Sequence, residues 1–114
     1  MKVYLSHPYG KNEENRKRAA RIAAWYRRVW RKEGKAYELV NPLEELKDEE
    51  SQNTEDEMLG LAVEKMRSCD AVIFASGWKR SRGCRYEHMV AFADRKKIGY
   101  LPKRFCQMFE RPGA

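Results

Sequence analysis

The stretch DAVIFA, residues 70–75, decides the fold, because it is a continuous apolar run behind a single acid. Such a run is typical of a strand that is buried on both faces of a parallel sheet. Three further stretches are short and apolar enough to form strands: residues 2–5, 37–40 and 98–101. Between the strands, apolar residues recur at three- and four-residue steps, which predicts helices at about 12–33, 54–66 and 84–95.

This alternation of strand and helix predicts an α/β fold with three layers, of the flavodoxin or Rossmann type. A four- or five-stranded parallel sheet would carry helices on both faces. The helix ends carry the expected signals, since Asn12 can cap the first helix, Gly34 can end it, and TEDE at 54–57 has the form of a capping box. The acidic stretch 44–53 predicts a loop or a short exposed turn.

The length of 114 residues predicts one domain. We place an α/β domain at residues 1–101 and a C-terminal tail at 102–114, which can form a short helix at an interface. No apolar run approaches the ~18–20 residues of a membrane helix. Lys2 is not followed by the apolar segment of ~7–15 residues that a signal peptide requires, so we expect none here. The three cysteines form no CxxC pair, which argues against a zinc ribbon and a disulfide scaffold and favours a reducing cytoplasm. No cluster of ligands predicts a metal site.

The net charge of +7 comes from one segment. Residues 11–35 hold ten basic and three acidic residues, a difference of seven, and the remainder of the chain balances. A concentrated basic face can bind nucleic acid, an anionic surface or a phosphorylated small molecule. The same pattern is also that of a solvated helix face, and the sequence leaves both interpretations open.

In a parallel sheet, ligands bind at the carboxyl ends of the strands. Here those ends are residues 6–10, 75–83 and the loop after Leu101. Three polar residues are unusual for their setting: Asp70, Ser81 and Glu87. We expect them to converge on one pocket, where two carboxylates can divide the work of attack on an anomeric carbon and proton transfer to the leaving group.

Three segments resemble the nucleoside 2-deoxyribosyltransferase-like superfamily: MKVYLSHPYG at 1–10, NEENRKRAA at 12–20 and CDAVIFASGWKRSRGCRYE at 69–87. The last is similar to the signature G-W-x-x-S-x-G-x-x-x-E of a small bacterial and phage branch of unknown function, which is related to the 2'-deoxynucleoside 5'-monophosphate N-hydrolases. The resemblance covers residues 1 to about 101.

The resemblance implies a role for each matching residue. Glu87 would be the nucleophile, Asp70 the acid/base or orienting group, and Tyr4 the aromatic residue that hydrogen-bonds the catalytic carboxylate. Ser81 stands six residues before Glu87, where the monophosphate hydrolases carry a phosphate-binding serine, so the resemblance implies a 5'-phosphorylated substrate. Arg82, Arg85 and Lys11 are near enough in sequence to add phosphate contacts.

Further candidate substrate-binding residues lie in the same loops: Ser6, His7, Gly10, Trp78, Arg82 and Gly83. Loop amides around Gly10 and Gly83 can bind phosphate. Trp78 either stacks on a base or covers the core, and His7 is either a pocket donor or a turn residue. The chain departs from the family pattern at Pro8, which removes an amide donor, and at the pair His88-Met89 after the nucleophile.

Three functions remain open. The first is an N-glycosidase or deoxyribosyltransferase that acts on 2'-deoxynucleoside 5'-monophosphates through a covalent glycosyl-Glu intermediate, without metal or organic cofactor. The second is a non-catalytic nucleotide-binding module on the same fold, and the third is nucleic-acid binding through the basic first helix. Relatives of the superfamily assemble as dimers or larger oligomers, which implies a homo-oligomer; the apolar tail and the tryptophan-bearing first helix are candidate interfaces. No membrane partner is expected.

Overall fold

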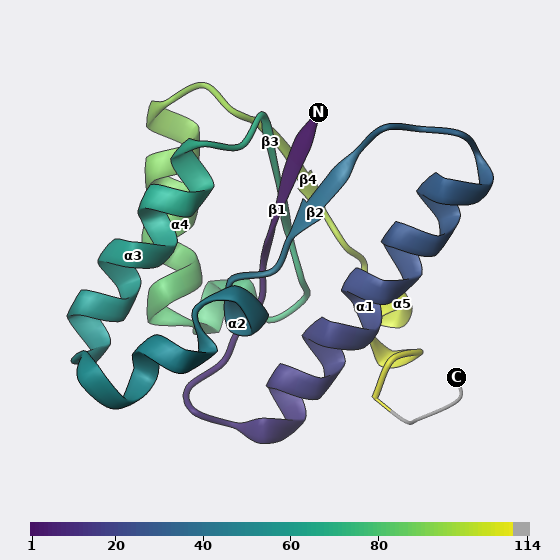
Figure 1. Ribbon diagram of the computed structural model, residues 1–114. Helices are drawn as coiled ribbons and strands as arrows, with labels where there is room; N and C mark the ends of the chain where they lie inside the picture. Colours follow the sequence, from purple (N-terminus) through teal and green to yellow (C-terminus); the bar gives the residue numbers. More distant parts are fainter. Residues whose placement is uncertain (111–114) are drawn as a thin grey trace.

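Figure 1 shows the protein as a computed structural model, which describes residues 1–110. Within these residues four strands form one sheet in the order β2-β1-β3-β4, and every neighbouring pair is parallel. The strands are β1 (Lys2–Ser6), β2 (Glu38–Val40), β3 (Ala71–Phe74) and β4 (Lys97–Tyr100). The predicted α/β class and the parallel four-stranded sheet are therefore confirmed.

Helices cover both faces of this sheet, as predicted (Figure 1). The helices α1 (Glu13–Lys32) and α5 (Lys103–Gln107) lie on one face, and α3 (Glu55–Arg67) and α4 (Arg82–Ala93) lie on the other. Three short helices fill the connections: α2 (Pro42–Glu45) and the 3-10 helices η1 (Lys47–Gln52) and η2 (Trp78–Arg80).

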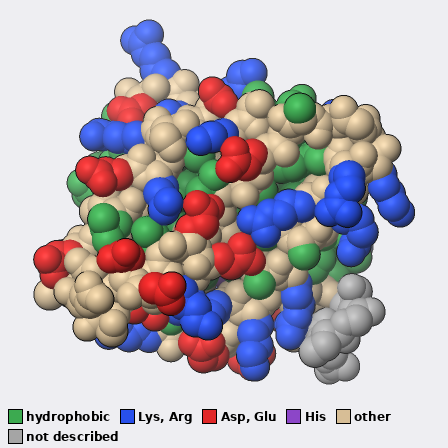
Figure 2. All heavy atoms as spheres, in the orientation of Figure 1, with side chains coloured by type: hydrophobic (Ala, Val, Ile, Leu, Met, Phe, Trp, Pro, Cys, Tyr) green, Lys and Arg blue, Asp and Glu red, His purple; other side chains and the backbone are tan. Residues whose placement is uncertain are grey.

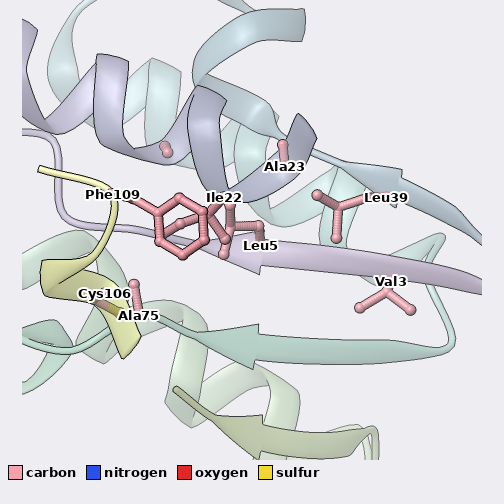
Figure 3. Close-up of a cluster of buried hydrophobic side chains, with 9 residues drawn as sticks. Val3, Leu5, Ile22, Ala23, Leu39, Ala75, Cys106 and Phe109 are labelled. Carbon is pink, nitrogen blue, oxygen red and sulfur yellow. The ribbon is translucent and has the colours of Figure 1, made fainter. Parts of the chain in front are cut away.

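The side chains of β1 alternate between two hydrophobic cores, because successive strand residues point to opposite faces. Val3 and Leu5 pack against α1 and the α5 segment, in the cluster that Figure 3 shows with Ile22, Cys106 and Phe109. Tyr4 packs on the other face, in a cluster formed with residues of α3, β3 and α4. This alternation directs Tyr4 and Ser6 toward α4, which positions the site described below.

Capping side chains begin α1 and α3 where the sequence predicts, whereas α4 begins at Arg82, two residues before the predicted start. The Oδ1 atom of Asn12 accepts from the backbone N–H groups of Glu14 at 2.8 Å and Asn15 at 3.3 Å. Thr54 and Glu57 form the reciprocal capping box at the start of α3. The acidic stretch 44–53 differs from the expected loop, since Asn41 caps α2 and η1 follows it directly. Pro42 at the first helical position favours this turn, because its ring presets the helical φ.

The tail contains α5, whose Cys106 and the following Phe109 are buried in the core of this chain. The Trp25 ring of α1 lies 5.3 Å from the ring of Phe105 and 6.4 Å from that of Phe109, centroid to centroid. Residues 111–114 of the predicted tail lie outside the described residues. The domain boundary near residue 101 stays a prediction. In residues 1–110 no helix is both long and apolar enough to cross a membrane.

The chain leaves β1 toward one face of the sheet and leaves β3 toward the other, although these strands are neighbours. Such a switch point opens a crevice at the carboxyl ends of the strands. The two loops touch there, because Pro8 Cγ lies 3.8 Å from the place where a Cβ on Gly77 would stand. Gly77 adopts a φ of 87°, which a residue with a side chain rarely adopts.

Candidate functional site

A pocket of about 450 Å³ lies at the carboxyl edge of the sheet, on the α3–α4 side of the loop that follows β1. Its walls come from four parts of the chain: the 7–11 loop, the α2–η1 segment, the start of α3 and the start of α4. Leu43, Leu46, Met58 and Leu59 supply apolar surface to the lining, and Glu87 of α4 adds a carboxylate. The pocket is therefore mainly apolar with a few polar groups, as small-molecule sites usually are.

Glu87 is buried, with 6% of its surface exposed, and both of its carboxyl oxygens are hydrogen-bonded. The hydroxyl of Tyr4 donates to Oε2, and the hydroxyl of Ser6 donates to Oε1 at 2.9 Å. Both donors are fully buried and stand two residues apart on β1, so they share the face of the strand that α4 covers. This arrangement orients the carboxyl group and leaves it among the residues that line the pocket.

Burial raises the pKa of Glu87 from 4.5 to about 7, because the charged form loses its hydration. The hydrogen bonds from Tyr4 and Ser6 act in the opposite direction and lower the pKa, but they offset only part of the burial effect. The pKa of the Tyr4 hydroxyl is raised, first by burial and then by the neighbouring Glu87, so Tyr4 stays a hydrogen-bond donor. Glu87 therefore titrates near neutral pH, in the range where a carboxyl group can either accept or donate a proton.

The structure brings most of the predicted site residues together. Seven of them line the pocket: Tyr4, His7, Gly10, Ser81, Arg82, Gly83 and Glu87. Lys11 lines it too, whereas Arg85 is exposed and does not. Ser6 lies behind the pocket, where it supports Glu87. The roles of these residues in catalysis and binding stay predictions.

The expectation that Asp70 meets Glu87 in the pocket is wrong. Asp70 precedes the first residue of β3 and so lies at the amino edge of the sheet, opposite the pocket. It is exposed, and its Oδ2 atom accepts from the backbone N–H of Lys2 at 2.8 Å. The amino and carboxyl ends of parallel strands lie at opposite edges, so an acid that opens a strand cannot reach this pocket.

Trp78 covers the core, which was one of its two expected positions. Its ring stacks on His88, with centroids 4.2 Å apart, and lies 5.3 Å from the Phe74 ring. It does not line the pocket of Glu87 but lines a second hollow on the other side of Pro8. Stacking of Trp78 on a base held beside Glu87 is therefore not supported by the geometry. His88 faces this aromatic group, and its Nε2 atom lies 2.7 Å from the hydroxyl of Tyr100.

His7 is buried and neutral. Its Nε2 atom accepts from Nε of Arg18 at 3.0 Å, and its Nδ1 atom lies 2.7 Å from the carbonyl oxygen of Pro8. The arrangement suits the tautomer with a proton on Nδ1. Burial lowers the pKa of His7 to about 4, and the nearby Arg18 guanidinium lowers it further, whereas the Pro8 carbonyl opposes the shift. His7 thus holds the 7–11 loop against α1.

Arg16 supports the pocket wall, a role that the sequence analysis missed. Its guanidinium donates to the Tyr9 hydroxyl, to the Leu43 carbonyl and to Oε1 of Glu50, the last at 2.6 Å. Tyr9, Leu43 and Glu50 all line the pocket, so Arg16 joins the loop after β1 to the α2–η1 segment. The sequence did contain a signal for this role. Arg16 lies three and seven residues before the buried Ala19 and Ala23, which places a charged side chain on the buried face of the helix.

Two predicted phosphate contacts are partly engaged elsewhere. Ser81 caps α4, and its Oγ atom accepts from the backbone N–H of Cys84 at 3.3 Å. Arg82 is exposed and pairs with Asp56 on α3. The charged residues that line the pocket balance, with Lys11, Arg80 and Arg82 against Glu50, Glu55 and Glu87. In the described part of the chain, no group of His, Cys, Asp and Glu could hold a metal ion.

The basic segment 11–35 uses several of its charges within the protein. Figure 2 shows Lys and Arg side chains gathered over α1 and acidic ones over the α2–η1 side. Arg21 donates to the carbonyl of Phe109, and Arg27 donates to Glu44 and to the carbonyl of Leu39. With Arg16 and Arg18, these side chains attach α1 to neighbouring elements. These four arginines thus have a structural role, while nucleic-acid binding through the segment stays a prediction.

Comparison with known proteins identifies a family. No curated protein and no solved structure is similar enough to count as a match. The family described as a domain of unknown function (DUF4406) matches residues 1–100. This range contains all four strands of the sheet, the Tyr4–Glu87 pair and every residue that lines the pocket. The chain therefore belongs to the DUF4406 family.

Proposed function

We propose that the protein is an N-glycosidase or deoxyribosyltransferase that acts on 2'-deoxynucleoside 5'-monophosphates. The observation that carries this proposal is Glu87, a buried carboxyl group that lines a pocket and is held on both oxygens by hydroxyl donors. A nucleophilic carboxylate requires such a fixed orientation. The resemblance of residues 69–87 to the nucleoside 2-deoxyribosyltransferase-like superfamily supports the same role.

The reaction takes two steps. In the first, an Oε atom of ionised Glu87 forms a bond to the anomeric carbon while the bond from that carbon to the base nitrogen breaks. The base leaves with the electron pair and takes up one proton. In the second, water attacks the anomeric carbon, gives up a proton and releases the Glu87 carboxylate; in a transferase a second base replaces the water. This chemistry requires neither a metal nor an organic cofactor.

The proton for the leaving base must come from a group other than Asp70, which lies at the opposite edge of the sheet. We assign this proton to a water molecule in the pocket. Attack itself needs Glu87 in its ionised form. We therefore expect the rate to rise with pH through about 7, where the pKa of Glu87 lies.

We place the 5'-phosphate near Ser81, at the start of α4. The backbone N–H groups at a helix start favour an anion, and Lys11 and Arg82 line the same pocket. The three cysteines are buried free thiols, which supports action in a reducing compartment such as the cytoplasm.

The test is incubation with each of the four deoxynucleoside monophosphates while free base is followed by chromatography. We expect base release by the native protein and a loss of more than about a hundredfold in Glu87→Gln and Glu87→Ala. Glu64→Gln is the matched control, because Glu64 is exposed on α3 and does not line the pocket. Undiminished activity in Glu87→Gln would refute the assigned nucleophile, and no release from any substrate would refute the activity.

A non-catalytic nucleotide-binding module is the second candidate, and the position of Asp70 favours it. In residues 1–110 the hydrogen-bond partners of Glu87 are hydroxyl groups, so no second acid assists it. A binding module predicts saturable nucleotide binding without base release, and this binding would survive Glu87→Gln. Calorimetry beside the chromatographic assay separates the two candidates.

We also propose that the chain forms a homodimer or larger homo-oligomer through α4. Tyr86, Met89 and Phe92 are 46%, 60% and 75% exposed, and their spacing of three residues places them along one side of the helix. The tail and the tryptophans of α1, by contrast, pack on the core of this chain. Light scattering tests the proposal: we expect an oligomer that Met89→Glu with Phe92→Glu reduces to a monomer. A native monomer would contradict it.

A further inference from the structure

A second hollow of about 610 Å³ lies beside the pocket of Glu87, on the other side of Pro8. It sits beyond the carboxyl ends of β3 and β4, between the start of α1 and α5. The two hollows share four lining residues: Pro8, Asn15, Arg80 and Ser81. A ligand held near Ser81 can therefore extend from one into the other.

The charge of the second hollow differs from that of the pocket. Its lining holds four cations, Arg18, Lys79, Arg80 and Lys103, and one carboxylate, Glu110. In residues 1–110 the side chains of Lys79, Arg80 and Lys103 carry no ion pair, whereas Arg18 pairs with Glu110 at 3.3 Å. Three cations without an ion pair in one concave wall favour an anionic ligand, because the wall focuses their potential.

Arg80 stands at the junction of the two hollows. Its Nη2 atom lies 3.8 Å from the place where a Cβ on Gly77 would stand, next to Pro8 Cγ at the same distance. The guanidinium thus lies over the loop that follows β3 and lines both hollows. Polar groups continue from this point into the second hollow, where Ser76, Asn15 and Gln107 line the wall.

We propose that the second hollow binds the outer phosphates of a nucleoside di- or triphosphate, with the first phosphate near Ser81 and Arg80. The identification of the ligand as a nucleotide rests on the proposed function. The inference that the ligand carries several negative charges does not rest on the proposed function. Basic and acidic residues are equal in number in the lining of the Glu87 pocket, whereas basic residues outnumber acidic ones in the lining of the second hollow. A monophosphate near Ser81 would leave Lys79 and Lys103 without a ligand group, whereas a longer phosphate chain would extend into the hollow that these two lysines line.

Binding of inorganic tripolyphosphate and of inorganic phosphate, measured by calorimetry at low salt, tests the hollow without any sugar or base. We expect tripolyphosphate to bind at least tenfold more tightly than phosphate. The double variant Lys79→Glu with Lys103→Glu should lose at least tenfold in tripolyphosphate affinity. Lys97→Glu with Lys47→Glu is the matched control of equal charge change, because neither lysine lines the hollow. Equal affinity for the two anions, or an equal loss in the control, would overturn the proposal.

A second arm uses nucleotides on the Glu87→Gln variant, which keeps the ligand intact. A deoxynucleoside triphosphate should bind at least tenfold more tightly than the matching monophosphate, and the Lys79/Lys103 double variant should remove the difference. Tighter binding of single-stranded DNA than of the triphosphate would overturn the choice of ligand. If base release fails while tripolyphosphate still binds, the proposed activity is wrong and the anion site stands. If base is released but tripolyphosphate does not bind, the anion site is wrong and the proposed activity stands.

Discussion

Replacement of Glu87 by Gln should change the pH dependence of stability, independently of any activity. The native carboxyl group has a pKa of about 7, whereas in the unfolded chain its pKa is near 4.5. Between these pH values the folded protein binds more protons than the unfolded chain at this position. Protonation of Glu87 therefore stabilises the folded protein. This contribution to the unfolding free energy is fully present below pH 4.5 and is lost as the pH rises to about 7.

The size of the effect follows from the same two values. A shift from 4.5 to about 7 corresponds to about 3 kcal/mol of stability, at about 1.4 kcal/mol for each pH unit. Glutamine does not titrate, so Glu87→Gln lacks this loss. Its amide carbonyl can still accept a hydrogen bond from Ser6 or Tyr4, while its NH₂ group must find an acceptor. The altered hydrogen bonds should change the unfolding free energy of the variant by an amount that does not depend on pH. In addition, between pH 4.5 and 8 the variant should gain about 3 kcal/mol of unfolding free energy relative to the native protein.

Urea unfolding of both proteins at several pH values between 4.5 and 8 measures the difference in unfolding free energy at each pH. The titration of other groups, including His7, is common to both proteins and cancels in that difference. Glu64→Gln is again the control, because Glu64 is an exposed carboxyl group on α3. A Glu87→Gln difference that stays constant within about 0.5 kcal/mol would refute the raised pKa and the desolvation that causes it.

Three further variants test the structure around the site. The pKa of His7 is lowered to about 4, so between pH 6.5 and 4 the unfolded chain binds more protons at this position than the folded protein. From pH 7 to pH 4 the unfolding free energy of His7→Gln should therefore fall by about 3 kcal/mol less than that of the native protein. Equal falls for the two proteins in urea unfolding would contradict this. Arg16→Met should cost about 2–3 kcal/mol in chemical unfolding, since it leaves Glu50 and the Leu43 carbonyl without their donor; a cost below about 0.5 kcal/mol would show that this link is not needed. Thr54→Ala removes the capping box of α3 and should cost about 1 kcal/mol in thermal unfolding, with an unchanged melting temperature as the contrary result.

The sequence by itself predicted the layers of this protein, because those depend on interactions between near neighbours. The apolar run at 70–75, the caps at Asn12 and Thr54 and the spacing of apolar residues in α1 each specify an element locally. The order of strands and loops also placed residues 6–10 and 75–83 at the carboxyl edge of the sheet. Ser81 and Glu87 do line one pocket at that edge, although the structure alone shows that Ser81 caps α4.

Only the tertiary structure decided which groups face each other across that edge. The sequence marks Asp70 and Glu87 as two unusual acids, yet Asp70 contacts Lys2 at the amino edge while Glu87 contacts Tyr4 at the pocket. Likewise Arg16 and Glu50 stand 34 residues apart and meet because α2 and η1 pack beside the start of α1. Local spacing determines the direction in which a side chain points within its element. Its partner is set by the packing of whole elements, which is driven by burial of apolar surface and has no short-range pattern in the sequence.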